Sequence, residues 1–201
     1  MRPVWRQAPI GALATALGIA FGIALIIVPA TARAMVWTVA PEQSRVLFEY
    51  QRNSQPAEGR FTEFAGKGMF DPDAPGDATL ELRIESASID LDDALASAFA
   101  TSAEWFDSAN HPLVVYRLLK LTPEGGDSYH AVGELTIRGR TRPIESTITL
   151  EIGDGNRAAH ASGSLWMDRR DYLLGVGPSA LFVDIGREVA VHFDLTAHPA
   201  R

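Results

Sequence analysis

Five arginines in two short segments are the side chains of this sequence best suited to bind a charged ligand. Arg138, Arg140 and Arg142 alternate through one predicted turn, and Arg169 and Arg170 are adjacent in a second segment. Guanidinium groups bind phosphate oxygens through paired hydrogen bonds. The spacing therefore makes Arg138, Arg142 and Arg170 candidates for holding a phosphorylated headgroup. The alternative is that these are solvated arginines of surface turns.

Histidines and acids do not form a pattern typical of a metal or catalytic site. The five histidines show no H-x-H pair, no pair four residues apart and no H-E-x-x-H motif. A site assembled from neighbouring strands is the alternative. Asp90, Asp92 and Asp93 could form an acid cluster, but they lie at the start of a predicted helix, where capping explains them more simply. Ser108 lies near an aspartate and a histidine but lacks a nucleophile elbow, so we expect no catalytic residue, no metal and no cofactor.

Alternating apolar side chains form the other candidate site. They repeat with period two, which places them on one face of each predicted strand. Two interpretations fit: they line a lumen that holds a lipid chain, or they form an ordinary dry core. A bound chain of ten to fifteen carbons would contribute roughly 8–12 kcal/mol at about 0.8 kcal/mol per methylene, before the cost of association. The predicted inward-facing set is Phe48, Tyr50, Phe61, Leu80, Leu82, Ile84, Leu135, Ile137, Ile148, Leu150 and Trp166.

Two alternating segments around a glycine turn must position much of this face. Residues 128–137 and 144–152 each alternate apolar and polar side chains, and Gly139 lies between them, where it can adopt positive φ. The pattern predicts a long antiparallel hairpin. One face of this hairpin is apolar and the other is polar.

The rest of the chain supplies further strands and one helix. Strands are predicted over 37–40, 45–51, 59–70, 80–85, 113–121, 157–167 and 189–196, with a polar loop over 52–58 and a helix from residue 91 to Trp105-Phe106. Strands do not alternate with helices as a parallel sheet requires, and a sandwich is the alternative to a closed barrel. We favour an all-β fold, an antiparallel lipocalin-like barrel of about eight strands with one short helical insertion, wide enough for one small ligand.

The first 34 residues have the anatomy of a secretory signal peptide. Arg2 and Arg6 precede an apolar run over residues 8–30, and Ala32-Arg33-Ala34 is a small-x-small cleavage signal. We predict cleavage after Ala34, which leaves residues 35–201 as one domain in the periplasm or outside the cell. An uncleaved anchor is the alternative, since the run is long enough to span a bilayer.

The predicted mature chain is strongly acidic and contains no cysteine. Residues 35–201 carry 15 basic and 25 acidic side chains, a net charge of −10. This charge argues against nucleic acid and against anionic lipid headgroups as partners. Without cysteine, the exported protein forms no disulfide, so its stability must come from packing.

Several motifs resemble those of the YceI-like family, the lipocalin-like polyisoprenoid-binding proteins. The most specific is the segment 133–143, GELTIRGRTRP, which is similar to the family's G-x-L-T-I-R-G-V-T-R-P. The segment 59–66, GRFTEFAG, resembles the family's G-x-F-x-x-F-x-G strand. The resemblance extends over residues 37–197. Further likenesses are Ser88-Ile89-Asp90, Trp105-Phe106-Asp107 through Pro112, and Arg170-Asp171-Tyr172.

The resemblance implies an extended antiparallel barrel around a long apolar tunnel that holds an isoprenoid or similar lipid chain. It favours the lumen over the dry core, and it implies a binding protein rather than an enzyme. Some relatives are fused to, or encoded with, a membrane b-type cytochrome. The alternative function is therefore a non-enzymatic accessory or stress-related envelope protein that partners such a cytochrome. A homodimer is left open.

Overall fold

Strands make up most of the protein. The computed structural model describes residues 35–153, 155, 157–178 and 184–200, so the predicted signal peptide over 1–34 lies outside the described residues. The α-helix of the described part is α1 (Ala94–Ala100), and its 3-10 turns are η1 (Pro41–Gln43), η2 (Pro75–Asp77), η3 (Ser86–Ser88) and η5 (Arg169–Tyr172). The strands are β1 (Met35–Val39), β2 (Arg45–Arg52), β3 (Gln55–Phe61), β4 (Phe64–Phe70), β5 (Thr79–Glu85), β6 (Ile89–Asp90), β7 (Leu113–Gly125), β8 (Ser128–Ile137), β9 (Arg140–Ile152), β10 (Ala159–Asp168) and β11 (Glu188–Pro199).

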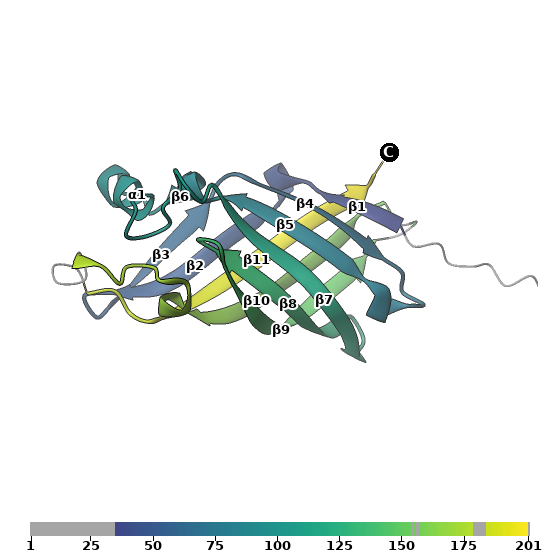
Figure 1. Ribbon diagram of the computed structural model, residues 1–201. Coiled ribbons are helices and arrows are strands. Elements are labelled where there is room, and N and C mark those ends of the chain that lie inside the picture. Colours follow the sequence, from purple (N-terminus) through teal and green to yellow (C-terminus); the bar gives the residue numbers. More distant parts are fainter. Residues whose placement is uncertain (1–34, 154, 156, 179–183, 201) are drawn as a thin grey trace, which may run out of the picture. The chain divides into compact units, whose positions relative to one another are not determined.

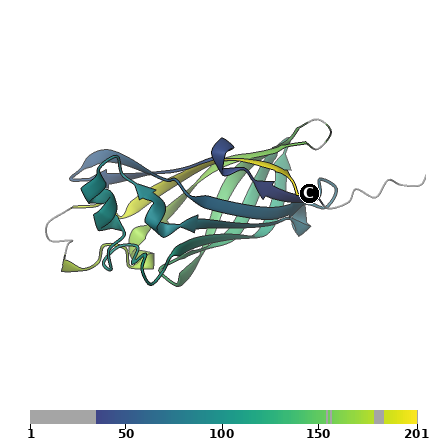
Figure 2. The ribbon, with the colours of Figure 1, turned by 90° about the horizontal axis from the view of Figure 1, so that it is seen from above.

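Eight of these strands close into an antiparallel barrel (Figure 1). The order around the barrel is β1-β4-β5-β7-β8-β9-β10-β11, and β1 pairs with β11 to complete the ring. From β11 the sheet also continues through β2, β3 and β6 toward the end that carries α1 (Figures 1 and 2). β1 and β2 both pair with β11 and are separated by η1, so they are the two halves of one bent strand. The predicted antiparallel barrel with one short helix is confirmed.

The predicted central hairpin is formed by β8 and β9. Its register pairs Ile137 with Arg140, so the turn consists of Arg138 and Gly139 alone. Their φ angles are 50° and 68°, the left-handed values that a tight two-residue hairpin turn requires at both positions. The turn therefore ends one strand and begins the next without a loop between them.

The polar segment 52–58 is not the loop that its composition predicted. A two-residue turn at Asn53 and Ser54 connects β2 directly to β3, and Gln51 pairs with Pro56 in this hairpin. The first residues of β3 are largely exposed to water. Because these residues are exposed, the strand needs no alternation of apolar and polar side chains here. The sequence without that alternation therefore indicated a loop.

The helix is shorter than predicted. Asp93 is its N-cap, with the carboxylate accepting hydrogen bonds from the N–H groups of Leu95 and Ala96, and α1 ends at Ala100 rather than near Trp105-Phe106. The residues after Ala100 form successive turns. Within the described residues, no helix has the length and apolar composition needed to cross a membrane.

Two clusters of buried side chains lie inside the barrel. The larger cluster includes Val46, Leu135 and Tyr172 and extends to the turns near α1. The smaller cluster lies at the opposite end, where buried Leu121 and Ala131 pack with Tyr129. The side chains of the larger cluster surround a space that they do not fill.

Candidate ligand-binding cavity

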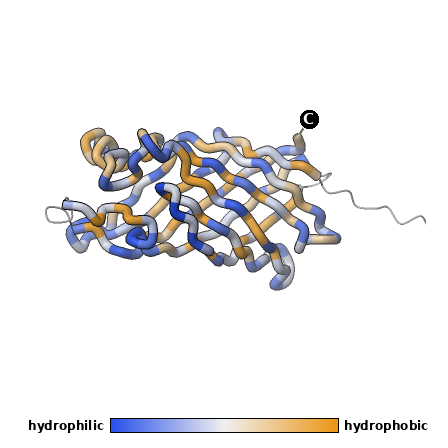
Figure 3. The backbone as a smooth tube through the Cα atoms, in the orientation of Figure 1, coloured by the Kyte–Doolittle hydropathy of each residue, from blue (hydrophilic) through white to orange (hydrophobic). Residues whose placement is uncertain are grey.

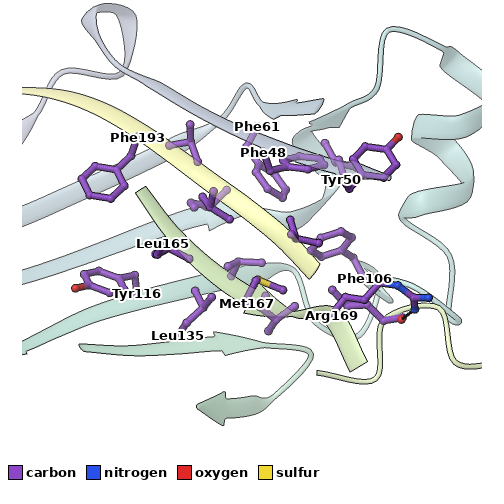
Figure 4. A pocket seen from close by; sticks show the side chains of 18 of the residues that line it. Phe48, Tyr50, Phe61, Phe106, Tyr116, Leu135, Leu165, Met167, Arg169 and Phe193 are labelled. Carbon is purple, nitrogen blue, oxygen red and sulfur yellow. Dashed lines mark hydrogen bonds between the residues drawn. The ribbon is translucent and has the colours of Figure 1, made fainter. Parts of the chain in front are cut away.

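An apolar cavity of about 640 Å³ runs along the inside of the barrel. Figure 4 shows Tyr116 and Phe193 toward one end of it and Tyr50, Phe106 and Arg169 toward the other. Along β10 the lining extends from Ala161 to Met167, which is about 20 Å of strand and about 15 Å along the axis for a typical barrel tilt. Arg169 of η5 extends the lining further. The cavity is thus elongated, as an extended chain requires.

Most of the predicted pocket residues lie on the cavity wall. Two of the eleven, Leu150 and Trp166, do not. Contact of the others with a ligand stays a prediction. The nine wall residues are Phe48, Tyr50, Phe61, Leu80, Leu82, Ile84, Leu135, Ile137 and Ile148.

The prediction that Trp166 faces the cavity is wrong. Its side chain is 68% exposed on the outer face of β10, and its neighbours Leu165 and Met167 line the cavity instead. Residues 165–167 are three consecutive apolar residues, so alternation permits either the middle one or the outer two to face inward. Ala161 shares the inward face, but a small side chain gives little hydrophobic signal in a sequence.

Leu150 faces inward but does not line the cavity. It packs in the smaller cluster with Leu121 and Ala131, at the end of the barrel that side chains fill. The alternation along β9 therefore identified its face correctly. Alternation carries no information about depth along the barrel axis, so it could not separate Leu150 from the wall residue Ile148.

The predicted set also omitted several wall residues. Besides Leu165 and Met167, the wall contains Tyr116 on β7 and Val191 and Phe193 on β11. Val191 and Phe193 alternate with polar residues near the C-terminus. That alternation was the signal that could have found them.

Tyr116 places a polar atom deep within the apolar lumen. Its ring lies against Gly133, where a Cβ atom would come within 2.6 Å of the phenol oxygen, so only glycine leaves room for the ring at this position. Burial raises the pKa of Tyr116 to about 12. The phenol therefore stays neutral at physiological pH and presents a hydroxyl rather than a charge to the lumen.

The opposite end of the cavity is held by a buried arginine. Arg169 is only 5% exposed, and burial lowers the pKa of its guanidinium. Its nitrogens donate hydrogen bonds of 2.5–3.0 Å to four backbone carbonyls, and its guanidinium carbon lies 5.5 Å from the centroid of the Trp105 ring. Arg169 thus connects η5 with the loops that form the cavity rim. The four acceptors are the carbonyl oxygens of Leu174, Gly175, Ile185 and Gly186.

The three predicted headgroup residues do not lie on the cavity wall. Arg138 donates hydrogen bonds to the carbonyl oxygens of Leu173 at 2.5 Å and Ala103 at 2.8 Å, so its guanidinium connects two loops. Arg142 and Arg170 are exposed. The charged residues that line the cavity within the described chain are instead Arg52, Asp93 and Arg169, all at the α1 end. A headgroup role for the predicted three stays a prediction.

The remaining polar clusters have structural partners. Arg60 pairs with Asp90 and, at 2.8 Å, with Asp92. The Ser108 hydroxyl is buried and makes no hydrogen bond to another described residue, so it is not activated by His111. In the part of the chain that the structure describes, no three His, Asp or Glu side chains gather as metal ligands.

Comparison with known proteins agrees with this architecture. Residues 37–197 match the family model described as the YceI-like domain. A UPF0312 protein of Vibrio cholerae is 23% identical over 176 residues, which cover 83% of this chain and 92% of that protein.

Two solved structures share the fold. Burkholderia cenocepacia BcnA superimposes with a TM-score of 0.71 at 25% identity, covering 79% of this chain and 98% of BcnA. A polyisoprenoid binding domain from Saccharophagus degradans, implicated in plant cell wall breakdown, gives a TM-score of 0.67 at 14% identity. That match covers 83% of this chain and 99% of the domain.

Proposed function

The chain belongs to the YceI-like family, and we propose that it is an exported protein that sequesters or carries one long-chain amphiphile, such as an isoprenoid, inside its barrel. The observation that carries this proposal is the elongated apolar cavity. Its volume of about 640 Å³ is within the range of roughly 300–1,000 Å³ typical of small-molecule sites. The polyisoprenoid binding domain from Saccharophagus degradans shares the fold, which supports the same ligand class.

The polar end of the ligand would lie at the α1 end of the barrel. Arg52, Asp93 and Arg169 line the cavity there, whereas the deep wall is apolar apart from hydroxyl groups such as that of Tyr116. A charged headgroup placed deep in the lumen would lose its hydration without gaining a charged partner. The chain would therefore enter tail first.

This function can be tested by blocking the lumen. Ala161→Phe adds a ring to the cavity wall, and Ser164→Phe adds the same ring to the exposed outer face of the same strand. Native mass spectrometry of protein purified from its own cells should show one bound amphiphile in the wild type and in Ser164→Phe, and none in Ala161→Phe. Wild-type protein that is empty and gains no thermal stability from added polyprenyl phosphate or fatty amides would contradict the proposal.

Export is the second part of the proposal. Its support is the basic start, apolar run and Ala-x-Ala signal of residues 1–34. The intact mass of the protein recovered from the periplasm or the medium should correspond to residues 35–201. Retention of the first 34 residues would indicate a membrane anchor instead. The b-type cytochrome partner stays a prediction of the resemblance, and a homodimer stays open.

A further inference from the structure

Large apolar side chains are exposed on two segments beside the open end of the cavity. Leu95 and Phe99 on α1 are 81% and 42% exposed, and Leu173 and Val176 after η5 are 38% and 49% exposed. Figures 1 and 3 show α1 and the loop after η5 at the same end of the barrel, with apolar stretches on both. These four residues are called the apolar rim below.

The apolar rim is continuous with the cavity wall. Leu95 and Phe99 line the cavity as well as facing water, so a ligand that leaves the lumen crosses them. The two rim segments are also fixed to each other. Besides the two hydrogen bonds of Arg138, the Gly175 N–H donates to the Glu104 carbonyl oxygen at 2.8 Å. The rim is therefore a defined surface rather than a set of independent loops.

Three exposed arginines lie beside one side of the rim. Arg140 and Arg142 begin β9, which packs against η5, and Arg170 belongs to η5, just before Leu173. Within the described residues, none of these three guanidinium groups forms an ion pair. The acids beside this group include Asp171 in η5 and Glu104, whose carboxyl group lies against Gly177 next to Val176, so the three arginines exceed these two acids by one positive charge. Arg140, Arg142 and Arg170 are called the basic patch below.

We propose that the apolar rim and the basic patch dock the open end of the barrel on a bilayer that contains anionic phospholipids. Burial of apolar side chains in the interface and attraction of arginines to anionic headgroups are the two contributions that hold peripheral proteins on membranes. The inference rests on the proposed function, because docking in this orientation lets an amphiphile pass between bilayer and cavity without crossing water.

The charge of the whole chain sets the orientation of this docking. Residues 35–201 carry a net charge of −10, so an anionic surface repels most of the protein and attracts the basic patch. The sequence-based expectation that anionic headgroups are disfavoured used only the net charge. The structure places the basic patch beside the exposed apolar side chains of the rim. This end of the barrel can therefore attract an anionic surface although the chain as a whole is acidic.

Vesicle co-sedimentation of the purified protein tests the docking. The probes are vesicles of phosphatidylcholine alone and of phosphatidylcholine with one quarter phosphatidylglycerol. Wild type should bind the anionic vesicles more tightly, and high salt should weaken this binding. The double variant Arg140→Gln, Arg170→Gln should lose about fivefold in affinity per arginine on anionic vesicles only. Arg157→Gln, an exposed arginine in the β9–β10 connection, is the matched control and should bind as wild type.

The rim is tested with the double variant Leu173→Asn, Val176→Ser. Neither residue lines the cavity, and Leu173 has φ 58°, which asparagine tolerates well. This variant should lose binding to both kinds of vesicle, whereas Leu119→Asn, which changes an exposed leucine on β7, should not. Absence of wild-type binding, or equal losses in the controls, would overturn the inference. If the wild type self-associates in the absence of vesicles and the rim variant does not, the rim binds a second copy of the chain. That result would also overturn the inference.

A second readout separates this inference from the proposed function. Binding of a fluorescent long-chain amphiphile, kept below its critical micelle concentration, should be the same in the rim variant and the wild type, while extraction of that probe from vesicles should be slower in the variant. Cavity binding without any vesicle binding would overturn the docking alone. Vesicle binding without cavity binding would overturn the proposed function.

Discussion

The two ends of the barrel differ in how they are stabilised. At the end away from α1, Leu121 and Ala131 are 2% and 1% exposed, and aromatic and aliphatic side chains fill the space between the strands. At the α1 end, Arg169 holds four backbone carbonyls while apolar side chains beside it remain in water. One end is closed by packing and the other is kept open by hydrogen bonds.

This difference separates the stability of the barrel from access to its lumen. Side chains that pack in a dry cluster stabilise the fold by their burial. A guanidinium that binds loop carbonyls fixes those loops without filling the space that they surround. Substitution of a closed-end residue that does not line the cavity, such as Leu121, should therefore change stability alone, and substitutions at the open end should change both stability and ligand exchange.

The largest effect is expected from Arg169→Met. Four carbonyl acceptors would lose their hydrogen-bond donor. Each carbonyl that stays buried without a partner destabilises the folded state by about 1–3 kcal/mol, and water that enters the site would offset part of this loss. We expect the free energy of unfolding to fall by about 4 kcal/mol in urea titrations. Arg170→Met, at the exposed neighbour, should cost less than about 0.5 kcal/mol. Equal effects of the two substitutions would remove the role assigned to Arg169.

Leu121→Ala tests the closed end. Truncating a buried leucine should lower the free energy of unfolding by about 3 kcal/mol, and Leu119→Ala, at an exposed leucine of the same strand, should leave it nearly unchanged. Because Leu121 does not line the cavity, the affinity for a long-chain amphiphile should stay within about twofold of wild type. A loss of affinity matching the loss of stability would show that the two ends are not independent.

Asp168→Asn tests the open end through pH. Partial burial alone would raise the pKa of Asp168, but the Arg170 N–H and the Arg187 guanidinium stabilise its carboxylate and hold the pKa below its ordinary value. The ionised Asp168 carboxylate therefore makes its full contribution to the free energy of unfolding above the ordinary pKa near 4. This contribution is lost as the pH falls through the lower pKa of the folded state. The variant should lose about 1 kcal/mol at neutral pH. Its unfolding curve should converge on that of wild type in acid, and a constant difference at all pH values would contradict the assignment.

Tyr116→Phe should have the smallest effect on stability. The hydroxyl makes no hydrogen bond to a described residue, so we expect a change below about 0.5 kcal/mol at neutral pH. Its folded pKa of about 12 lies above the ordinary value near 10, so the wild type should lose stability between those pH values and the variant should lose less. In ultraviolet titration the variant should lack one phenol that ionises near pH 12. Loss of a phenol ionising near pH 10 instead would indicate a water-filled lumen.

Sequence patterns predicted the barrel because period two survives wherever one face of a strand is buried. The β8–β9 hairpin shows this most clearly, since its two strands alternate along most of their length. The same pattern failed for Trp166, where three apolar residues in a row permit both orientations. It also failed for residues 55–58, because this part of the strand is largely exposed to solvent and no buried face imposes the alternation.

The role of each arginine could not be predicted from local sequence. Arg138 and Arg169 both bind backbone carbonyls of segments distant in the chain, and only the closed barrel brings those carbonyls within reach. Arg169 and Arg170 are adjacent, yet one is buried and the other is exposed. Neighbours in a 3-10 turn point in different directions, and composition alone does not reveal which of them faces inward.

The most direct test is to locate the two ends of a bound chain by methyl NMR with spin-labelled stearate. A label near the methyl end of the stearate should broaden the methyl signals of Ile148 and Ala161, deep in the lumen. A label near the carboxylate should broaden those of Leu95 and Ile185 at the open end. The reverse assignment, or broadening confined to residues on the outer face of the barrel, would contradict a lumen that opens beside α1 and shelters the apolar tail.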